Sequence, residues 1–249
     1  MTDQGNTGRM PPVIIAHRTS PLDAPENSLA GIERSAALGA DYVEIDVRLT
    51  RDGVPVMLHD RLLLRTTGRP WPVSRSSAAA LRRARLRGSG ERVPTFAEAV
   101  AALPDGLGVA VDTKDPSAAE AVVAELRNQG RLGRALLWAQ SERAVRWYAA
   151  NAGGEAGEVA LLRDALTSEA IDRFLADAVA FGATAISAHQ ASVDEAFLAR
   201  AHGMGLRVHC WFQDEATQAT KAALPLDGIV TDWPVEARRL SAVRPPAAG

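Results

Sequence analysis

Residues 13–47 read VIIAHRTSPLDAPENSLAGIERSAALGADYVEIDV, and this stretch decides the fold class. A short apolar run (13–17) is followed by a longer run rich in alanine and leucine (27–38) and, after Gly39, by a second apolar run (42–47). Short apolar runs bounded by turn residues are typical of buried strands, and the longer run between them is typical of a helix. The stretch therefore predicts one strand–helix–strand unit.

The same alternation continues to the end of the chain. We predict eight strands at residues 13–17, 42–47, 109–113, 135–139, 158–162, 185–189, 207–211 and 228–232. Helices are predicted between them, for example at 27–38, 95–103, 117–129, 141–151, 168–181 and 193–203. Asn27 and Thr95 suit helix N-caps, and Gly39 and Gly130 suit helix stops. Eight strands with helical crossovers favour a closed TIM (β/α)8 barrel, and an open doubly wound sheet is the alternative. With 249 residues, the usual length of one barrel, we expect a single domain over residues 1–249.

One connection breaks this rhythm. About fifty residues separate the second predicted strand from the helix near residue 95. We expect an insertion there, at about residues 53–92, that opens with a hairpin turn at Asp52-Gly53. Residues 61–92 hold nine arginines and a single acid, Glu91. Two interpretations stay open: a solvated and locally disordered cap, or a positive surface that contacts an anionic substrate or, peripherally, anionic lipid headgroups.

The overall composition is that of an ordinary globular protein, with 47% hydrophobic residues, 23% charged residues and a net charge of −2. This balance gives no reason to expect nucleic acid as a partner, and no stretch is long and apolar enough for a transmembrane segment. The start of the chain lacks the pattern of a secretory signal. The single cysteine, Cys210, excludes an internal disulfide and fits a reducing compartment, so we expect a cytoplasmic protein. The sequence does not indicate an oligomeric state.

Acidic residues mark the ends of two predicted strands. Glu44 and Asp46 lie two apart on one strand and point to the same side, and Asp112 lies on the next strand. In a barrel these side chains face one pocket. Carboxylates at close range repel one another, and a bound Mg²⁺ or Ca²⁺ relieves the repulsion with hard oxygen ligands, with Mn²⁺ as a further option. The alternative is a structural ion network in which the acids pair with Arg18 and Lys114.

Two histidines suit proton transfer, because imidazole changes charge near neutral pH. His17 ends the first predicted strand and His59 follows the hairpin, although each position is also compatible with a structural role. Arg18 and Lys114 suit a phosphate group, the first as a planar fork and the second as a point charge. His189 also ends a predicted strand; it is either an additional site residue or, in the interpretation that we prefer, an ordinary strand-end histidine.

Residues 16–68 resemble the N-terminal motifs of the glycerophosphodiester phosphodiesterase family. They contain, in the order and spacing of that family, His-Arg, Pro-Glu-Asn, Glu-x-Asp, Thr-x-Asp-Gly, His-Asp and Arg-Thr-Thr. Further matches are VPTFAEAV (93–100), MGLRVHCWF (204–212) and LDGIVTDWP (226–234). The resemblance therefore covers nearly the whole predicted barrel, and it also implies the small insertion after the second strand.

The resemblance implies a divalent-metal-dependent phosphodiesterase that cleaves glycerophosphodiesters to an alcohol and glycerol 3-phosphate. It implies a general acid and base, a set of metal ligands and a set of substrate contacts. These are His17 and His59 for proton transfer, Glu44, Asp46 and Asp112 for the metal, and Arg18, Lys114 and Trp211 for the substrate. Glu26 and Asn27 would shape the loop under the site, with Asn27 mainly a helix cap and Glu26 an outer partner of the site residues.

Departures from the family pattern concern the substrate more than the reaction. Asp112 replaces the usual glutamate and is one methylene shorter, and Thr19 replaces the glycine that usually follows His-Arg, where its side chain would crowd the phosphate. Phe212-Gln213-Asp214 also departs from the pattern. Two alternative functions follow: a lysophospholipase D acting on lysophospholipids, or an anion-binding barrel without turnover. The sequence does not assign the acid and base roles, and it leaves open whether water or a glycerol hydroxyl attacks the phosphorus.

Overall fold

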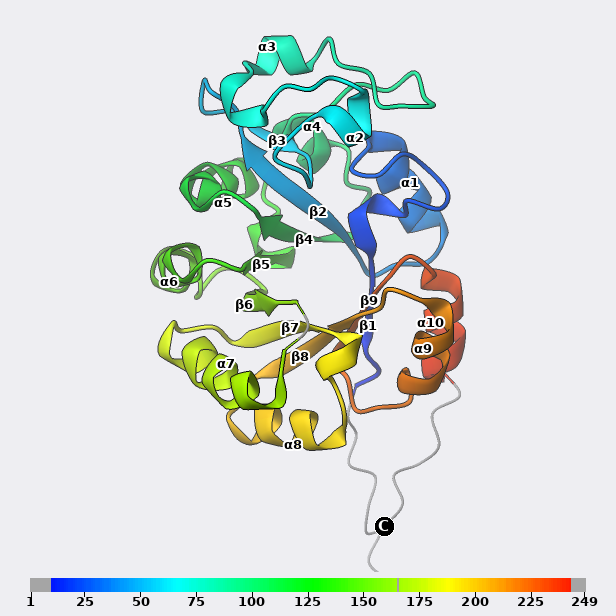
Figure 1. Ribbon diagram of the computed structural model, residues 1–249, viewed down its shortest axis with the longest axis vertical. Helices are drawn as coiled ribbons and strands as arrows, with labels where there is room; N and C mark the ends of the chain where they lie inside the picture. The colour runs from blue at the N-terminus through cyan, green and yellow to red at the C-terminus, as the bar shows by residue number, and fades with distance from the viewer. Residues whose placement is uncertain (1–9, 165, 243–249) are drawn as a thin grey trace, which may run out of the picture.

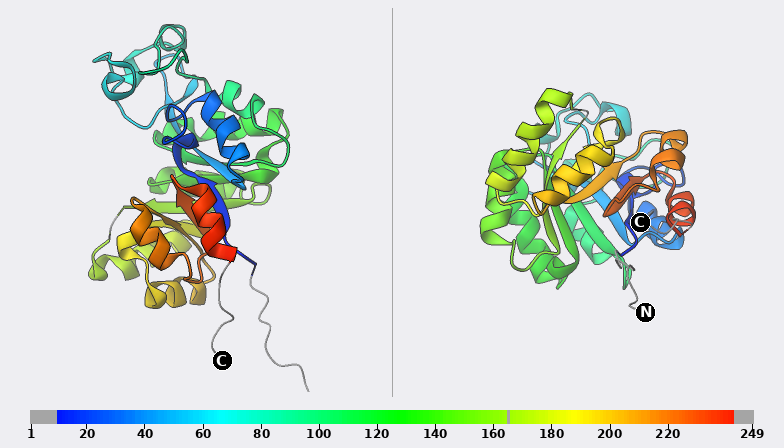
Figure 2. Two further views of the ribbon diagram at one scale, coloured as in Figure 1. Left: turned by 90° about the vertical axis from the view of Figure 1, so that its right-hand side faces the viewer. Right: turned by 90° about the horizontal axis from the view of Figure 1, so that it is seen from below.

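The computed structural model describes residues 10–164 and 166–242. In this part of the chain, parallel strands form a closed eight-stranded barrel with helices around it (Figures 1 and 2). The parallel strands are β1 (Val13–Ala16), β2 (Tyr42–Leu49), β4 (Gly108–Thr113), β5 (Ala135–Ala139), β6 (Glu158–Arg163), β7 (Ala185–His189), β8 (Arg207–Trp211) and β9 (Gly228–Thr231). Strand β1 pairs with β9 on one side and with β2 on the other, which closes the sheet. The predicted barrel is confirmed, and the open doubly wound sheet is wrong.

Helices follow the strands as the alternation predicts. The main helices are α1 (Leu29–Ala37), α4 (Phe96–Ala101), α5 (Ala119–Asn128), α6 (Glu142–Asn151), α7 (Ser168–Ala180), α8 (Glu195–Gly203), α9 (Glu215–Lys221) and α10 (Pro234–Ala242). Thr95 caps α4 as predicted, because its side chain accepts a hydrogen bond from the Glu98 N–H while Glu98 reaches back to the Thr95 N–H. Gly39 and Gly130 follow α1 and α5 with φ of +78° and +65°, the left-handed conformation of a helix stop.

Two apolar layers hold the barrel together. The larger one lies between the strands and the surrounding helices and includes Ile45, Val111, Leu137, Tyr148 and Phe197. A smaller cluster of side chains lies inside the barrel. It consists of Ile15, Ala110, Leu136, Trp138, Ala160, Ala185 and Val230. The barrel interior is therefore filled by packed side chains, and only its carboxyl end is left open for a functional site.

The insertion after β2 forms an ordered lobe beside the barrel. Strand β3 (Pro55–Met57) runs antiparallel to β2, and Gly53 makes the turn between them with φ of +77°, as the Asp52-Gly53 pair predicts. The chain then forms α2 (Leu64–Thr67) and α3 (Ala78–Leu81), which project beyond the barrel in Figure 2. A separate apolar cluster fills this lobe. It consists of Val56, Leu58, Leu63, Val73, Leu81, Ala84, Leu86 and Val93. The interpretation as a locally disordered cap is therefore wrong.

The turn after β1 differs from the expectation for Thr19. Arg18, Thr19 and Ser20 all have positive φ, at 41°, 62° and 60°. Thr19 is buried, and its Oγ1 accepts a hydrogen bond from the Ser28 N–H at 3.1 Å. Its side chain lies against Gly31 of α1, where an added Cβ would lie 2.3 Å from the Thr19 carbonyl oxygen. The expectation that Thr19 crowds the phosphate is therefore wrong, because the side chain packs under the loop instead of lining the cavity.

This contact leaves no room for a side chain at Gly31. We expect Gly31→Ala to lower the free energy of unfolding by about 1–3 kcal/mol, the usual cost of overpacking a buried site. Urea unfolding measures the change. Gly203→Ala is the matched control, because Gly203 lies in a helix with nothing within 4 Å of its added Cβ. Equal stability of the Gly31→Ala variant and the wild type would contradict the packing described here.

A buried ion pair lies inside the barrel below the site. His209 on β8 lies 2.8 Å from both carboxylate oxygens of Glu158 on β6, and the Trp138 indole N–H donates to Glu158 at 3.0 Å. Burial raises the pKa of Glu158, but the charge and hydrogen bond of His209, with Arg207 and Trp138, outweigh it, so the pKa lies below its ordinary value. A depressed carboxyl pKa contributes stability that is present above the unfolded value and lost as pH falls.

The pH dependence of stability follows from this pair. We expect the free energy of unfolding to fall as pH drops below 4.5, the ordinary Glu value, and Glu158→Gln to flatten this dependence. Near neutral pH the variant should be less stable by about 3 kcal/mol, because His209 and Trp138 lose a buried partner. Urea unfolding across the acid range measures both effects. Glu236→Gln, which removes the same charge from an exposed pair with Arg239, should leave the profile nearly unchanged.

Candidate active site

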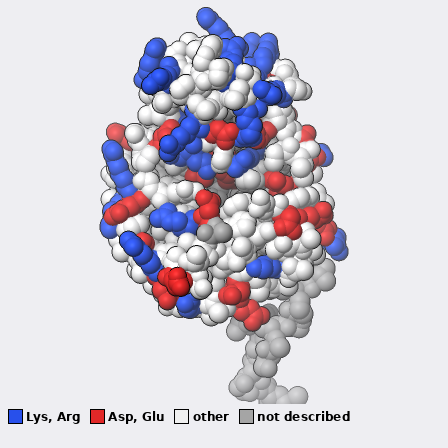
Figure 3. Space-filling model, in the orientation of Figure 1, with Lys and Arg blue, Asp and Glu red and all other residues white. Residues whose placement is uncertain are grey.

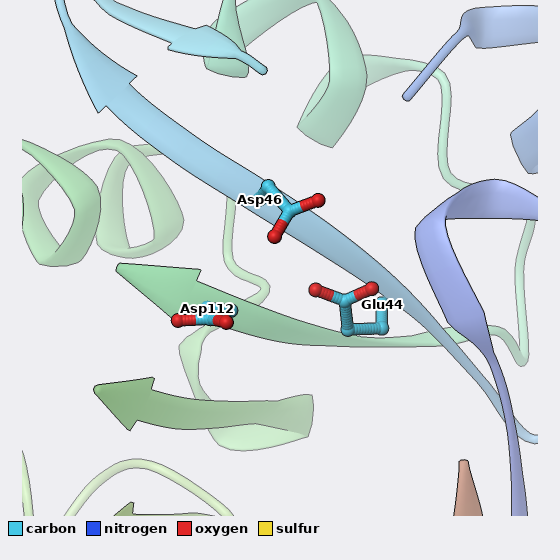
Figure 4. Close-up of side chains that lie close together, drawn as sticks. All are labelled: Glu44, Asp46 and Asp112. Atoms are coloured by element: carbon cyan, nitrogen blue, oxygen red, sulfur yellow. The ribbon is translucent and has the colours of Figure 1, made fainter. Parts of the chain in front are cut away.

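Three carboxylates meet at the carboxyl ends of β2 and β4. Glu44 and Asp46 point to the same side of β2, and Asp46 lies opposite Asp112 in the register of the two strands (Figure 4). One oxygen from each residue lies within 4.8 Å of the others, and all three residues are buried. The strand periodicity therefore brings together the three acids that the sequence singled out.

Asn27 fixes one of these acids. Its Nδ2 donates a hydrogen bond to Asp46 Oδ2 at 2.8 Å, and its Oδ1 accepts one from the Asp46 N–H at 3.0 Å. Asn27 has a φ of 53°, which asparagine tolerates better than most residues. The expectation that Asn27 is a helix cap is wrong, because Ser28 caps α1 by accepting from the Gly31 N–H at 3.0 Å. The side chain of Asn27 is instead used to orient a carboxylate.

The two predicted phosphate contacts lie among the acids. Lys114 forms ion pairs with Asp46, at 3.0 Å, and with Asp112. Arg18 lies 3.5 Å from Asp46, and its backbone N–H donates to Glu44 Oε2 at 2.7 Å. Burial alone would lower the pKa of Lys114, but the charges of the surrounding carboxylates outweigh this effect and hold the pKa above its ordinary value. Both cations therefore border the space above the acids.

An ion network alone does not satisfy this cluster. In the described part of the chain, Glu44 has no cationic side chain within ion-pair distance, and burial together with the charge of Asp46 raises its pKa to about 8. Asp112 Oδ1 is buried without any hydrogen-bond partner. Three buried carboxylates close together, one of them with an oxygen that has no partner, are the kind of donor set that a hard divalent cation takes. The residues present therefore fit such a cation, and they offer no sulfur or imidazole to favour zinc within the cluster.

Both histidines are held by an aspartate through the same ring nitrogen. His17 Nδ1 lies 2.8 Å from Asp232 Oδ1, and His59 Nδ1 lies 2.7 Å from Asp60 Oδ1. Each Nδ1–H donates to its carboxylate, which leaves Nε2 of each ring for the cavity. Burial lowers the pKa of His17, but the hydrogen bond to Asp232 and the charge of Glu44 outweigh it and raise the pKa above 6.5. Sequence reasoning gave neither aspartate this role, although Asp60 adjoins His59 and Asp232 follows the last strand.

A chain of ion pairs extends behind His59. Arg65 donates to Asp60 at 2.6 Å and, in a second contact, to Glu26 at 2.7 Å. Glu26 therefore acts as an outer partner, as expected, through Arg65 of the insertion. The insertion thus contributes directly to the placement of one imidazole.

A cavity of about 300 Å³ opens above the acids. The predicted site residues line it together with residues from the ends of β5 to β9. Its lining consists of His17, Arg18, Glu44, Asp46, Arg48, His59, Asp112, Lys114, Trp138, Gln140, Leu162, Arg163, Asp164, Ser187, Trp211 and Val230. Every residue predicted for catalysis, metal or substrate binding is therefore brought to one cavity.

Trp211 forms one wall of the cavity between two histidine rings. It stacks with His17 at a centroid distance of 6.2 Å, and it meets His189 edge-on at 4.5 Å. His189 also lies 3.3 Å from Gln213 and accepts from the Ala191 N–H, and it does not line the cavity. This placement agrees with its interpretation as a strand-end histidine.

Comparison with known proteins identifies the family. The model of the glycerophosphoryl diester phosphodiesterase family matches residues 17–236. The chain belongs to this family. The family and the phosphodiesterase activity predicted from the sequence are both confirmed, and the two alternative functions are not favoured. In the described part of the enzyme, no helix is long and apolar enough to cross a membrane.

Individual relatives agree with this assignment. The Mycobacterium tuberculosis protein named "Probable glycerophosphodiester phosphodiesterase 2" is 33% identical over 88% of this chain and 87% of its own length. Human glycerophosphodiester phosphodiesterase 1 is 43% identical over 35% of this chain and 29% of its own length. A phosphodiesterase of Oleispira antarctica, solved with its product sn-glycerol-3-phosphate, shares the fold with a TM-score of 0.81 at 24% identity, covering 92% of this chain and 96% of that one.

Proposed function

We propose that this enzyme hydrolyses glycerophosphodiesters to an alcohol and glycerol 3-phosphate. One observation carries the proposal: a buried carboxylate cluster that fits a divalent cation and two aspartate-held histidines line a single cavity. The product found in the Oleispira antarctica relative, sn-glycerol-3-phosphate, supports this substrate class. Glycerol 3-phosphate is small enough for a cavity of about 300 Å³.

We propose Glu44, Asp46 and Asp112 as the ligands of a Mg²⁺ or Ca²⁺ ion, with Mn²⁺ as a third option. The all-oxygen donor set supports a hard cation, and the shorter side chain of Asp112 still reaches the cluster. When bound, the cation would neutralise a non-bridging phosphate oxygen and favour deprotonation of the attacking hydroxyl. Turnover compared across the three metals after chelator treatment tests which ion serves.

Arg18 and Lys114 hold the phosphate from the two sides of the acid cluster. Both cations are partly buried and already fixed by carboxylates, so they need little reorganisation as negative charge grows on the phosphate oxygens. Trp211 forms the apolar wall beside them, against which the glycerol or the leaving group packs.

His17 and His59 move the protons. Each presents Nε2 toward the cavity because its Nδ1–H is donated to an aspartate, so one ring accepts a proton from the nucleophile and the other donates one to the leaving alcohol. The nucleophile is either water or the neighbouring glycerol hydroxyl. Phosphorus NMR during turnover distinguishes the two routes, because attack by the glycerol hydroxyl passes through a cyclic glycerol phosphate and attack by water does not.

A substrate panel tests the proposed activity. Glycerophosphocholine and glycerophosphoethanolamine should each release glycerol 3-phosphate, measured with a coupled dehydrogenase, and the release should stop when the metal is chelated. A clear preference for lysophospholipids would instead support a lysophospholipase D. Binding of phosphate analogues without hydrolysis in Mg²⁺, Ca²⁺ or Mn²⁺ would support a barrel without turnover.

We also propose a cytoplasmic location. The chain has a single cysteine, Cys210, which is buried and whose thiol pKa is raised by burial to about 12, so it is an inert core residue and no internal disulfide is possible. Fractionation of cells that produce the protein tests the location, and recovery from an exported fraction would contradict it.

A further inference from the structure

The insertion carries an excess of positive charge that the protein does not neutralise. Residues 61–92 hold nine arginines and one acid. Within the described chain, only Arg65 and Arg82 of these arginines lie within ion-pair distance of a carboxylate. The other seven are Arg61, Arg69, Arg75, Arg83, Arg85, Arg87 and Arg92. The one acid, Glu91, accepts hydrogen bonds from the Leu29 and Ala30 N–H groups at the start of α1. Figure 3 shows the resulting group of blue side chains over the insertion.

Exposed apolar side chains lie within the same arginine-rich segment. Residues 61–73, which we name the α2 loop, fold back on themselves, with Leu63 N–H donating to the Trp71 carbonyl and Leu62 pairing with Pro72. Leu63 packs into the lobe, whereas Leu62, Leu64 and Trp71 are 47%, 48% and 50% exposed. Large apolar side chains that gather on an exposed surface indicate a contact with another molecule.

Three arginines of the lobe lie in or beside the α2 loop. Arg69 lies over the Trp71 ring at 5.3 Å and donates to the Arg83 carbonyl at 3.2 Å. The Arg87 N–H donates to the Thr66 carbonyl, which holds Arg87 against the α2 loop. The loop is fixed from beneath by the apolar cluster of the lobe, so this surface is formed before any partner arrives. Exposed apolar side chains next to arginines that lack a carboxylate partner are the composition of a surface that inserts at a lipid headgroup layer.

The α2 loop also borders the catalytic cavity. A shallow groove adjoins that cavity and shares Arg48 and His59 with it. The outer side of the groove consists of Arg61, Leu62, Leu64 and Arg65. Any partner that binds the α2 loop would therefore lie beside the mouth of the cavity.

We propose that the α2 loop, with Arg69, Arg83 and Arg87, docks this enzyme on an anionic lipid bilayer and places the cavity mouth at the membrane surface. The arginines attract the anionic headgroups, while Leu62, Leu64 and Trp71 enter the headgroup layer. The docking itself is independent of catalysis. Only its consequence, a diesterase positioned at a membrane, rests on the proposed function.

Vesicle binding tests the proposal. The purified full-length chain is mixed with vesicles of phosphatidylcholine and phosphatidylglycerol or with vesicles of phosphatidylcholine alone, and bound protein is measured by flotation. We expect binding to the anionic vesicles only, and we expect high salt to weaken it, because screening shortens the reach of surface charge. Equal binding to both vesicles, or none to the anionic ones, would overturn the proposal.

Matched variants locate the surface. The triple variant Arg69→Ala, Arg83→Ala and Arg87→Ala should bind anionic vesicles about a hundredfold more weakly, at about fivefold for each arginine. The control is Arg143→Ala, Arg173→Ala and Arg200→Ala, which removes the same charge from exposed positions on α6, α7 and α8 and should keep wild-type binding. If both triple variants lose the same amount of vesicle affinity, the binding depends on the net charge of the protein and not on this surface, and the assignment is overturned.

Two further measurements separate docking from catalysis. Binding to the anionic vesicles should also weaken in the triple variant Leu62→Ala, Leu64→Ala and Trp71→Ala. An unchanged affinity would contradict insertion of these side chains into the headgroup layer. Turnover of soluble glycerophosphocholine should be unchanged in the arginine triple variant. If the protein binds vesicles but does not turn over substrate, the proposed function is contradicted and the docking proposal is kept. If the protein is active but does not bind vesicles, the docking proposal is contradicted and the proposed function is kept.

Discussion

Replacing His17 or His59 by alanine should lower kcat on glycerophosphocholine by about 10²–10⁴, the usual contribution of a positioned acid or base. The two rings face one cavity with Nε2 available, and each is held by an aspartate; among the described residues that line the cavity there is no third histidine. KM should change much less, because the variants keep Arg18 and Lys114, the proposed phosphate contacts. Steady-state kinetics at saturating metal measure both constants.

His189→Ala is the matched control for these variants. His189 touches the same tryptophan as His17 but does not line the cavity, so its loss should leave kcat within a small factor of the wild type. Thermal unfolding of each variant shows whether the fold is retained. Near-normal turnover of both the His17 and the His59 variants would remove them from the reaction.

The second large effect concerns the acid cluster. We expect Glu44→Gln or Asp112→Asn to weaken binding of Mg²⁺ or Ca²⁺ by more than about 100-fold, since even residues that only support a metal ligand contribute about 10–100-fold. Binding stabilises the native state by about 2.7 kcal/mol when the metal concentration is 100 times Kd. The wild type should therefore show a metal-dependent rise in Tm that the variants lose at the same concentration. This readout does not depend on turnover.

Asp164→Asn serves as the control for the metal prediction. Asp164 lines the same cavity but lies outside the cluster, so the variant should keep the rise in Tm. A wild type whose Tm does not respond to any of the three metals would contradict the assignment, as would cluster variants that respond like the wild type. Turnover measured beside Tm shows whether metal binding and activity are lost together.

The amino-acid sequence determined the barrel and the residues that meet in it. Eight apolar runs separated by helical segments specify parallel strands, and the carboxyl ends of parallel barrel strands all face one pocket. The spacing of Glu44 and Asp46 then places both on one side of β2, because side chains alternate along a strand. His17, Arg18 and Lys114 end or follow predicted strands by the same rule, which depends on local periodicity. The role of His59 was instead implied by the resemblance of the motifs to the family.

Only the tertiary structure decided how these residues are held. Asn27 orients Asp46 across 19 positions of the chain, and Asp232 holds His17 across 215 positions. Thr19 turns away from the cavity because Gly31 of α1 leaves room for it. The arginine-rich insertion folds around its own apolar cluster and holds Asp60 through Arg65. Such contacts depend on the relative placement of whole elements, and neither periodicity nor residue type encodes that placement at any one position.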